Sequence, residues 1–300
     1  KKEIKIKEEL IEIDSTLRKS GKNSLALCMI VKNEEENISN CINSVLDIVS
    51  EIVVVDTGSQ DKTVGIASSF GAKVINSEWK SDFSYSRNIA LENVKSDWII
   101  FLDADEQVEE ESIVELLTSI NREGIDGLSV EIKNIQEEGA FSEYDIFRLT
   151  RIFRNRKEFR YEGIIHEQIK PSMERAQAVI VESGINILHY GYHSIDENKI
   201  ERNAELLRKA IEKDPMNPYL NYQLGSTLFA KTDNAESLKY FANAVECNTR
   251  MDVLPENIKE KIFIKISQYY LQKDLFFEAK KYNEIALKIN RNNPISIYIS

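Results

Sequence analysis

The sequence predicts an α/β domain, built on an open, doubly wound mixed sheet, followed by an all-α domain. Three observations support this prediction. Short apolar runs alternate with helical patterns over residues 25–102, as in the strand–helix units of a largely parallel sheet. A mixed region with extended stretches continues to about residue 192, and the pattern is helical from about residue 196 onward. The chain is therefore divided into an N-terminal helical segment (1–23), an α/β domain (24–194) and helical repeats (195–300).

The elements follow in order along the chain. Residues 1–20 carry a rough amphipathic stripe, which predicts a short helix. Short apolar runs predict buried strands at 25–31, 52–55, 73–75 and 98–102. Helical patterns stand between these runs, over 38–45, from residue 61 onward, and over about 84–93. Extended stretches at 128–132, 147–153 and 179–188 predict the second half of the sheet.

The helical region carries a repeat. Ala210 and Ala244 stand 34 residues apart in similar surroundings, and this is the tetratricopeptide spacing. Ala286 follows 42 residues later, and we expect the loop 251–257 to absorb the extra residues. An unrelated helical bundle is the alternative.

Single residues of this region also fit the repeat. Leu224, Gly225 and Phe241 fall where the repeat places its small and bulky packing residues, whereas Asn221 stands where a tryptophan is usual. Such repeats offer a concave surface on which a peptide or protein can bind.

Composition limits the function classes. The 300 residues carry a net charge of −11, which argues against broad binding to nucleic acid or to an anionic membrane. No apolar run reaches the roughly 18 residues of a membrane span, and the charged first residues lack a signal-peptide core. Cys28, Cys41 and Cys247 form no CxxC pair and predict buried thiols in a reducing, cytoplasmic setting.

Polar residues follow the predicted strands at Asn33, Asp56 and Asp103. Ligands of doubly wound sheets bind at the carboxyl ends of the strands, so we expect these residues to converge. In the triplet Asp103-Ala104-Asp105, two carboxylates would repel each other in a pocket of low dielectric constant. A divalent cation, Mg²⁺ or Mn²⁺, would relieve this repulsion and bridge to a diphosphate. A solvated loop that caps a helix is the alternative, because Glu106 and Glu109 follow.

Other polar residues near these strands have two interpretations each. Asp56, Asn33 and Glu34 could contact a base or ribose, or could instead cap turns of their own loops. Arg87 could pair with a phosphate, or form a structural salt bridge with Asp103.

Histidines and arginines cluster after the triplet. The three histidines are His166, His189 and His193, and a neutral imidazole can complete a metal site that a carboxylate begins. Glu167 is a candidate general base. The alternative for each histidine is a satisfied buried polar group. A basic patch that could line a diphosphate or acceptor site, or simply be a solvated strand face, comprises Arg148, Arg151, Arg154, Arg156 and Arg160.

The motifs now on the page resemble those of family 2 glycosyltransferases. They are Ile30-Val-Lys-Asn-Glu34, Val54-Val-Asp-Thr-Gly-Ser59, Arg87-Asn88 and Phe101-Leu-Asp-Ala-Asp105. The resemblance covers about residues 24–192. Further motifs are similar to a bacterial subgroup that includes sublancin-type peptide S-glycosyltransferases and cell-envelope sugar transferases: Trp79-Lys80, Asp82-Phe-Ser-Tyr85, Ile165-His-Glu167 and His189-Tyr-Gly191.

The resemblance implies a GT-A fold, a UDP-sugar donor, a divalent metal (Mg²⁺ or Mn²⁺) and inversion at the anomeric carbon. It implies that Asp56 contacts the uracil, Asp103 the nucleoside and Asp105 the metal. We add His189 as a second metal ligand, and Glu167 with His166 as catalytic residues. The remaining expected donor contacts are Asn33, Glu34, Arg87 and Ala104. Expected contacts with diphosphate or acceptor are Trp79, Tyr85, Arg151, Arg154 and Tyr192.

The expected function is transfer of a hexose, with UDP-glucose as the expected donor, to a peptide acceptor held by the repeats. A cysteine thiol of a bacteriocin precursor is the expected nucleophile. The alternatives are a transferase for envelope polysaccharide or lipid-linked sugar, and a non-catalytic repeat scaffold. We expect neither a nucleic-acid partner nor a membrane span. The sequence leaves the oligomeric state open, with a homodimer as one option.

Overall fold

A computed structural model describes residues 23–135, 146–190, 197–231 and 234–299. The chain forms two compact units, Lys1–Ser194 and Ile195–Ser300. The helix expected over residues 1–20 lies outside the described residues.

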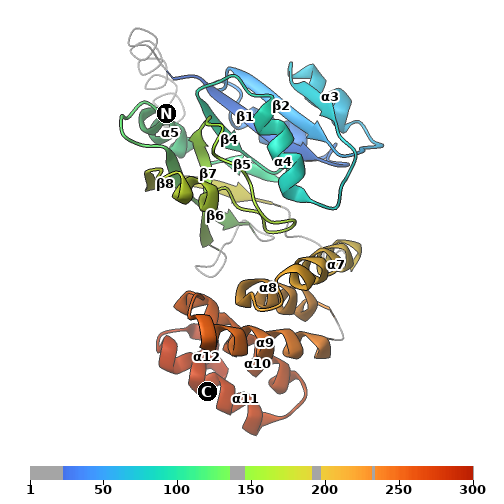
Figure 1. Cartoon of the computed structure of the whole chain (residues 1–300), viewed down its shortest axis with the longest axis vertical. Coiled ribbons are helices and arrows are strands. Elements are labelled where there is room, and N and C mark those ends of the chain that lie inside the picture. The colour runs from blue at the N-terminus through green and yellow to red at the C-terminus, as the bar shows by residue number, and fades with distance from the viewer. Residues whose placement is uncertain (1–22, 136–145, 191–196, 232–233, 300) are drawn as a thin grey trace, which may run out of the picture. The chain divides into compact units, whose positions relative to one another are not determined.

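The first unit contains one eight-stranded mixed sheet (Figure 1). Its strands, in spatial order, are β3 (Lys73–Asn76), β2 (Glu51–Asp56), β1 (Leu25–Val31), β4 (Trp98–Phe101), β7 (Ile146–Arg154), β6 (Gly127–Asn134), β8 (Ile180–His189) and β5 (Glu106–Val108). The strands from β3 to β4 are parallel, and β7 runs antiparallel to both β4 and β6. β8 is parallel to β6, and β5 is antiparallel to β8. The predicted doubly wound mixed sheet is confirmed.

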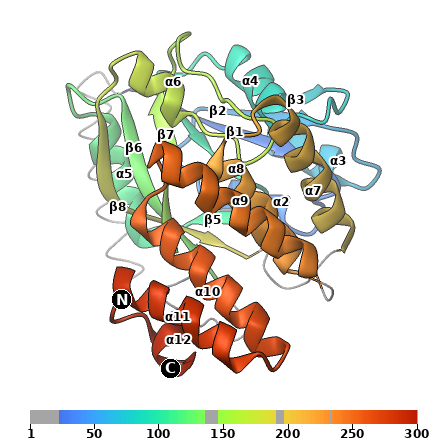
Figure 2. The same ribbon diagram turned by 60° about the horizontal axis from the view of Figure 1, so that its bottom comes forward.

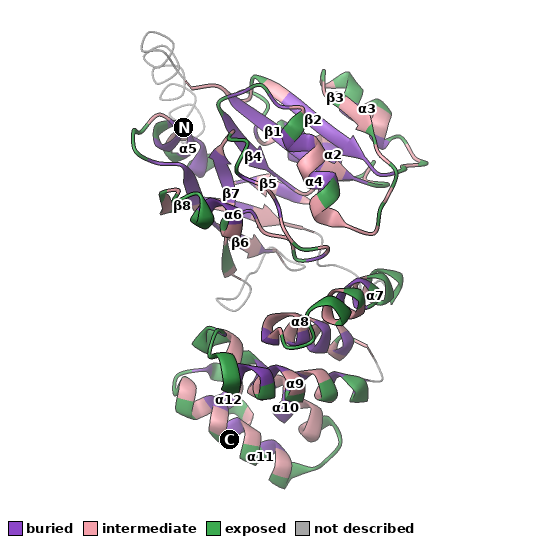
Figure 3. Cartoon of the chain, in the orientation of Figure 1, coloured by how far each residue is buried: buried purple, intermediate pink, exposed green. Residues whose placement is uncertain are grey.

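Helices cover both faces of this sheet. One face packs on α2 (Ile38–Asn43), α3 (Thr63–Ser69) and α5 (Ile113–Ile120), and the other on α4 (Phe83–Glu92) and α6 (Lys170–Arg175). Both views show α5 beside β8 (Figure 1, Figure 2). β1, β2 and β4 are buried nearly throughout, as Figure 3 shows by colour. This two-sided burial explains why their sequences are continuous apolar runs rather than alternating ones.

All seven predicted strands are present, and the structure adds elements that were not predicted. β5 has three residues, too few for an alternation to be recognised. A 3₁₀ turn, η1 (Glu110–Ser112), leads from β5 into α5. α5 has a helical spacing of apolar residues that the sequence does show, since Ile113, Leu116, Leu117 and Ile120 are all buried.

The second unit is all-α, as predicted, and its helices follow one another in antiparallel pairs (Figure 2). They are α7 (Glu197–Lys213), α8 (Pro218–Phe229), α9 (Ala235–Met251), α10 (Glu256–Gln272), α11 (Phe276–Ile289) and α12 (Pro294–Ile299). Ala244 and Ala286 are fully buried within this unit, as a packing repeat requires. Asn221 is buried at the unusual position, where its amide donates to the carbonyl oxygens of Pro215 and Asn217.

The expectation for the loop 251–257 is wrong. The connection before α10 spans residues 252–255, the same length as the connection 214–217 before α8. The longer spacing to Ala286 comes chiefly from the helices, because α10 has 17 residues and α8 has 12. α9 also continues to Met251, seven residues past Ala244, whereas α7 ends three residues past Ala210.

Within the described part of the chain, every helix is too short or too polar to cross a membrane.

Gly225 packs directly against the ring of Phe241, so Gly225→Val should destabilise the second unit. A Cβ atom at residue 225 would lie 2.7 Å from the Phe241 ring, which is fully buried and has no room to move. Overpacking of this kind costs about 1–3 kcal/mol, and urea unfolding measures it. The matched control is Gly65→Ala in α3, where a Cβ atom meets nothing within 4 Å. It should stabilise the chain by up to about 1 kcal/mol through helix propensity. Equal effects of the two variants would contradict the packing.

Candidate functional site

Parallel β1, β2 and β4 are neighbours, so the polar residues that follow them lie at one edge of the sheet. The loops after β1 and β2 are tied together. The Asn33 amide N–H donates to Ser59 Oγ (2.9 Å), and the Gln60 amide N–H donates to Asn33 Oδ1 (2.8 Å). The Glu34 amide N–H donates to Thr63 Oγ1 (2.7 Å). Asn33, with φ of 57°, is exposed at this edge.

Asp56 ends β2 and caps its own turn. Its carboxylate accepts the backbone N–H groups of Gly58 and Ser59 at 3.1–3.2 Å, and the residue is buried. Gly58 has φ of 105°, a conformation that favours glycine, and this lets the loop fold back over the carboxylate. The structure thus shows the turn-capping alternative. A contact between Asp56 and a base stays a prediction.

Asp103 lies between two arginines. Its Oδ1 accepts from Arg87 Nη2 at 2.9 Å, and its Oδ2 accepts from Arg151 Nη2 at 3.1 Å. Arg87 reaches the site from α4 and Arg151 from β7, and both arginines are buried. The Arg87 salt bridge with Asp103 is therefore present. Arg87 of α4 and Arg151 of β7 together orient Asp103, and about a third of its side chain is exposed.

Two more carboxylates extend these three residues into a five-residue group, which we call the Asp103 network. Arg87 Nε donates to Glu167 Oε1, and Arg151 Nη2 also donates to Glu106 Oε1 at 2.8 Å. Glu106 Oε2 accepts the backbone N–H of Asp103 at 2.9 Å, which fixes the turn that carries the triplet. The chain of contacts therefore runs from Glu167 through Arg87, Asp103 and Arg151 to Glu106.

Burial and charge shift the pKa values within the network. Burial opposes ionisation of Asp103, but Arg87 and Arg151 outweigh it and hold the pKa of Asp103 well below its usual range. Burial also opposes the charged form of Arg87, yet Asp103 and Glu167 raise its pKa. Burial, together with the charge of Asp103, raises the pKa of Glu106 to about 7, although Arg151 opposes this shift. Asp103 is therefore a fixed negative charge in the site.

An aromatic platform supports Arg87. The guanidinium carbon lies 4.5 Å from the ring centroid of Phe101 and 5.3 Å from that of Tyr161. Asn88, the next residue of α4, exchanges two hydrogen bonds with the backbone of Tyr161, at 2.9 and 3.0 Å. The Phe83 amide N–H donates to the Ile164 carbonyl oxygen at 3.0 Å. These bonds hold the loop that brings Glu167 to Arg87.

Asp105 faces His189. Its Oδ2 lies 3.3 Å from His189 Nε2, and both side chains are about a quarter exposed. His189 Nδ1 lies 2.7 Å from Oδ1 of Asn134, where β6 ends beside β8. Burial opposes protonation of His189, but its hydrogen bond to Asp105 and the nearby carboxylates outweigh this and raise its pKa. The amide oxygen of Asn134 favours a proton on Nδ1, which leaves Nε2 directed at Asp105.

The Asp105–His189 pair offers suitable ligand types for a divalent cation, but it supplies only two side chains. A carboxylate oxygen and an imidazole nitrogen that is held by a neighbouring amide form a common donor set. The described residues contain no group of three or more His, Cys, Asp or Glu side chains arranged to hold a metal. Mg²⁺ is commonly held by one or two protein side chains plus phosphate and water. The residues therefore fit an ion that is shared with a diphosphate.

The structure brings only some of the expected site residues together. Ala104 is buried between the two aspartates. His166 is exposed with φ of 51°, and the charge of the neighbouring Glu167 acts on its imidazole. Trp79 packs edge-on against Phe83, with ring centroids 4.7 Å apart, and Tyr85 is exposed on α4. Tyr192, like His193, lies outside the described residues.

The predicted basic patch is dispersed, which corrects the expectation for Arg154. Arg154 stands opposite Trp98 at the start of β4, whereas Asp103 follows the end of that strand. Its Nε donates to the Ile125 carbonyl oxygen, and its guanidinium lies over Trp98. Arg148 pairs with Glu131, and Arg156 pairs with Asp126. Of the arginines in the patch, Arg151 alone joins the Asp103 network.

The sequence patterns did not identify Glu106, Asn134 and Tyr161 as residues that contact the candidate site. Glu106 entered only the alternative of a loop that caps a helix, and its place opposite His189 depends on the unpredicted pairing of β5 with β8. Asn134 ends an extended stretch, the same signal that identified Asn33. Tyr161 lies in a loop, where no local pattern predicts its contact with Arg87.

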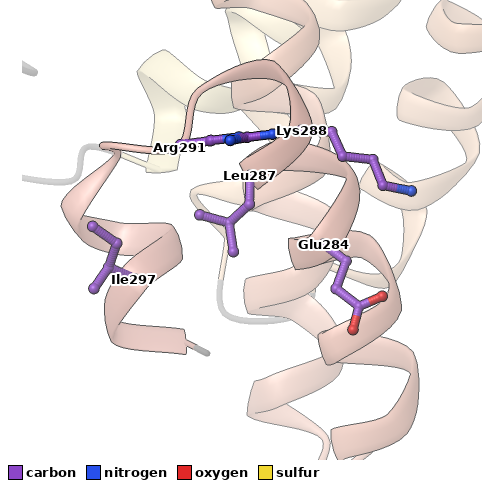
Figure 4. Close-up of a pocket in the computed structure, with 5 residues that line it drawn as sticks. All are labelled: Glu284, Leu287, Lys288, Arg291 and Ile297. Atoms are coloured by element: carbon purple, nitrogen blue, oxygen red, sulfur yellow. The ribbon is translucent and has the colours of Figure 1, made fainter.

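A hollow of about 500 Å³ lies on the second unit, lined by Glu284, Leu287, Lys288, Arg291 and Ile297 (Figure 4). None of the expected site residues lines it.

Comparison with known proteins identifies relatives of this chain. The model of glycosyl transferase family 2 matches residues 26–179. A TPR repeat-containing protein of Synechococcus elongatus is 35% identical over 219 residues, which are 70% of this chain and 53% of that protein. Glycosyltransferase SunS of Bacillus subtilis is 27% identical over 232 residues, or 76% of this chain and 54% of SunS. The chain thus spans about half the length of these curated relatives. The crystal structure of S. aureus TarS 1-349 aligns with a TM-score of 0.46 and 14% identity, covering 87% of this chain and 90% of that one.

Proposed function

Because the chain belongs to glycosyl transferase family 2, we propose that it transfers a hexose from a UDP-sugar to a peptide acceptor, with inversion. One observation carries this proposal. At the carboxyl end of β4, Asp103 is held by two arginines, while Asp105 faces His189. The two carboxylates of the triplet therefore have separate partners and can take separate roles.

On the donor side, we assign Asp103 to the nucleoside, with Asp56, Asn33 and Glu34 on the neighbouring strand ends. These residues lie at one edge of the sheet, where doubly wound folds bind ligands. Asp105 and His189 would hold Mg²⁺ or Mn²⁺, which supplies positive charge to the diphosphate as it leaves. UDP-glucose is the donor that we propose.

On the acceptor side, we assign Glu167 the role of general base. The nucleophile forms a bond to the anomeric carbon of the sugar, the bond from that carbon to the UDP oxygen breaks, and the acceptor proton passes to the Glu167 carboxylate. Arg87 holds Glu167 by one nitrogen and Asp103 by another, so a single guanidinium sets the position of both carboxylates. We propose a cysteine thiol as the nucleophile. The three free thiols of this chain are all buried, in keeping with a reaction in the bacterial cytoplasm.

Glu167→Gln should lower kcat by about 100-fold without weakening UDP binding. The assay mixes UDP-glucose, Mn²⁺ and a synthetic peptide with one cysteine, and mass spectrometry counts the peptide that gains a hexose. A thiol ionises by itself above its free pKa of about 8.5, so the deficit should shrink as pH rises. The same peptide with serine in place of cysteine should show no such rescue.

The matched control is Glu162→Gln in the same loop, because Glu162 pairs with exposed Arg175 rather than with Arg87. It should leave kcat unchanged. Equal losses in the two variants would contradict the role of Glu167. A peptide that never gains a hexose, although UDP binds, would refute the acceptor and leave the donor site standing.

A further inference from the structure

Lys265, in the middle of α10, is half-buried and lacks an acidic partner. No carboxylate lies within ion-pair distance of it among the residues that the structure describes. Its Nζ lies 4.8 Å from the ring centroid of Phe229, which ends α8. Burial and the nearby charge of Lys261 lower the pKa of Lys265. The ring attracts the cation but cannot accept all of its N–H groups, so this placement costs the fold free energy.

Some exposed cations of the same unit are paired with carboxylates, and others, such as Lys239 and Lys273, lie over aromatic rings as Lys265 does. Lys231 pairs with Glu201, Lys259 pairs with Asp252 and Glu256, and Arg250 pairs with Glu246. Pairs of this kind stabilise the fold least where water screens them. Among the lysines of this unit that lie over a ring, Lys265 is half-buried, whereas Lys239, Lys273 and Lys281 are exposed. Stability alone does not explain this, whereas a ligand would.

Ser226 provides a second, independent sign of a ligand. Its Oγ is buried and has no hydrogen-bond partner in the structure. It stands three residues before Phe229 on α8, so both residues lie on the same side of that helix. The hydroxyl of Ser226 thus lies on the same side of α8 as Phe229, the ring that Lys265 contacts. Buried polar groups are rarely left unsatisfied unless something else completes them.

We propose that Ser226, Phe229 and Lys265, which we call the Lys265 site, bind an acidic side chain of a peptide. One ammonium group and one hydroxyl match the single charge and paired oxygens of a carboxylate, whereas phosphate sites usually recruit arginine. Phe229 and the neighbouring Tyr222, which belong to one apolar cluster, offer contact to the rest of the peptide. This inference rests on the proposed peptide acceptor and specifies it, since the acceptor then carries a Glu or Asp residue that docks on the helical unit.

The test is a fluorescence-anisotropy titration of the full chain with a labelled peptide in which glutamate alternates with leucine and tyrosine. A second peptide has glutamine in place of every glutamate. The glutamate peptide should bind with saturation, and the glutamine peptide should bind at least about tenfold more weakly. Lys265→Met should lower the affinity for the glutamate peptide by about tenfold, whereas Lys265→Arg should keep the wild-type affinity.

Two controls separate this site from general charge and from misfolding. Lys280→Met removes an exposed lysine from α11 and should change neither affinity. Lys265→Met keeps the packing of the stem on Phe229, so its melting temperature should equal or exceed that of the wild type. No saturable binding of the glutamate peptide, equal losses in Lys265→Met and Lys280→Met, or a lower melting temperature of Lys265→Met would each overturn the inference. UDP binding, measured on the same samples, reports on the donor site separately.

Discussion

Replacing Arg87 with methionine is expected to stop sugar transfer and to destabilise the first unit. Arg87 is buried and binds both Asp103 and Glu167, so its loss leaves two carboxylates without their shared cation. Breaking a buried ion pair in this way costs about 3–5 kcal/mol of unfolding free energy. It also releases the residues that we assign to the nucleoside and to the acceptor proton. We expect kcat/KM to fall by at least about 100-fold.

Urea unfolding measures the loss of unfolding free energy, and the hexose-transfer assay measures the loss of kcat/KM. Arg87→Lys should recover part of the stability but little activity, because a single ammonium group cannot reproduce the Nε and Nη2 contacts with two carboxylates. Arg154→Met is the matched control, since Arg154 lies over Trp98 at the other end of β4. It should cost stability without changing UDP affinity. An Arg87→Met enzyme with normal kcat/KM would show that the Asp103 network is structural only.

Asp105→Asn should abolish the effect of metal on the chain while leaving its fold intact. Asp105 is partly exposed, faces His189 and makes no ion pair with the arginines of the network. Its substitution therefore breaks no buried pair, and the melting temperature should stay near that of the wild type. Loss of one of two protein ligands should lower Mn²⁺ affinity by more than the 10–100-fold typical of a supporting residue, so we expect at least about 100-fold.

Asn134→Leu should weaken Mn²⁺ binding less than Asp105→Asn does. It removes the amide oxygen that lies 2.7 Å from His189 Nδ1, so the imidazole loses its orientation but keeps its nitrogen. We expect a 10–100-fold loss of Mn²⁺ affinity, smaller than that of Asp105→Asn. Electron paramagnetic resonance counts free Mn²⁺ directly in both cases. Wild-type affinity in Asp105→Asn would remove this residue from the metal site.

The buried strands and the polar residues that follow them were predictable, because local patterns in the sequence identify both. The apolar runs of β1, β2 and β4 are buried on both sides, and the polar residue that follows each of them lies at one edge of the sheet. Asn33, Asp56 and Asp103 converge there because the order β2-β1-β4 makes their strands neighbours. Gly225 and Phe241 meet because the 34-residue spacing sets the packing of successive helices. In both cases, a pattern within one element or the repeat spacing identified the residues.

Contacts that depend on strand pairing were not predictable. Arg148, Arg151 and Arg154 are close together along the chain, but alternation and register in β7 send them to different partners. Glu106 meets Arg151 only in the folded sheet, because Arg151 lies on β7, 45 residues further along the chain. No local signal reports on such pairings, so the second half of the site required the structure.

Calorimetric titration of UDP into the full chain tests the central claim most directly. The account predicts binding in the presence of Mn²⁺ that a chelator abolishes, that GDP and dTDP do not reproduce, and that Asp105→Asn weakens by at least about 100-fold. Arg154→Met should bind UDP like the wild type. Absence of nucleotide binding under every condition would contradict the account and would favour a repeat scaffold that carries an inactive α/β unit.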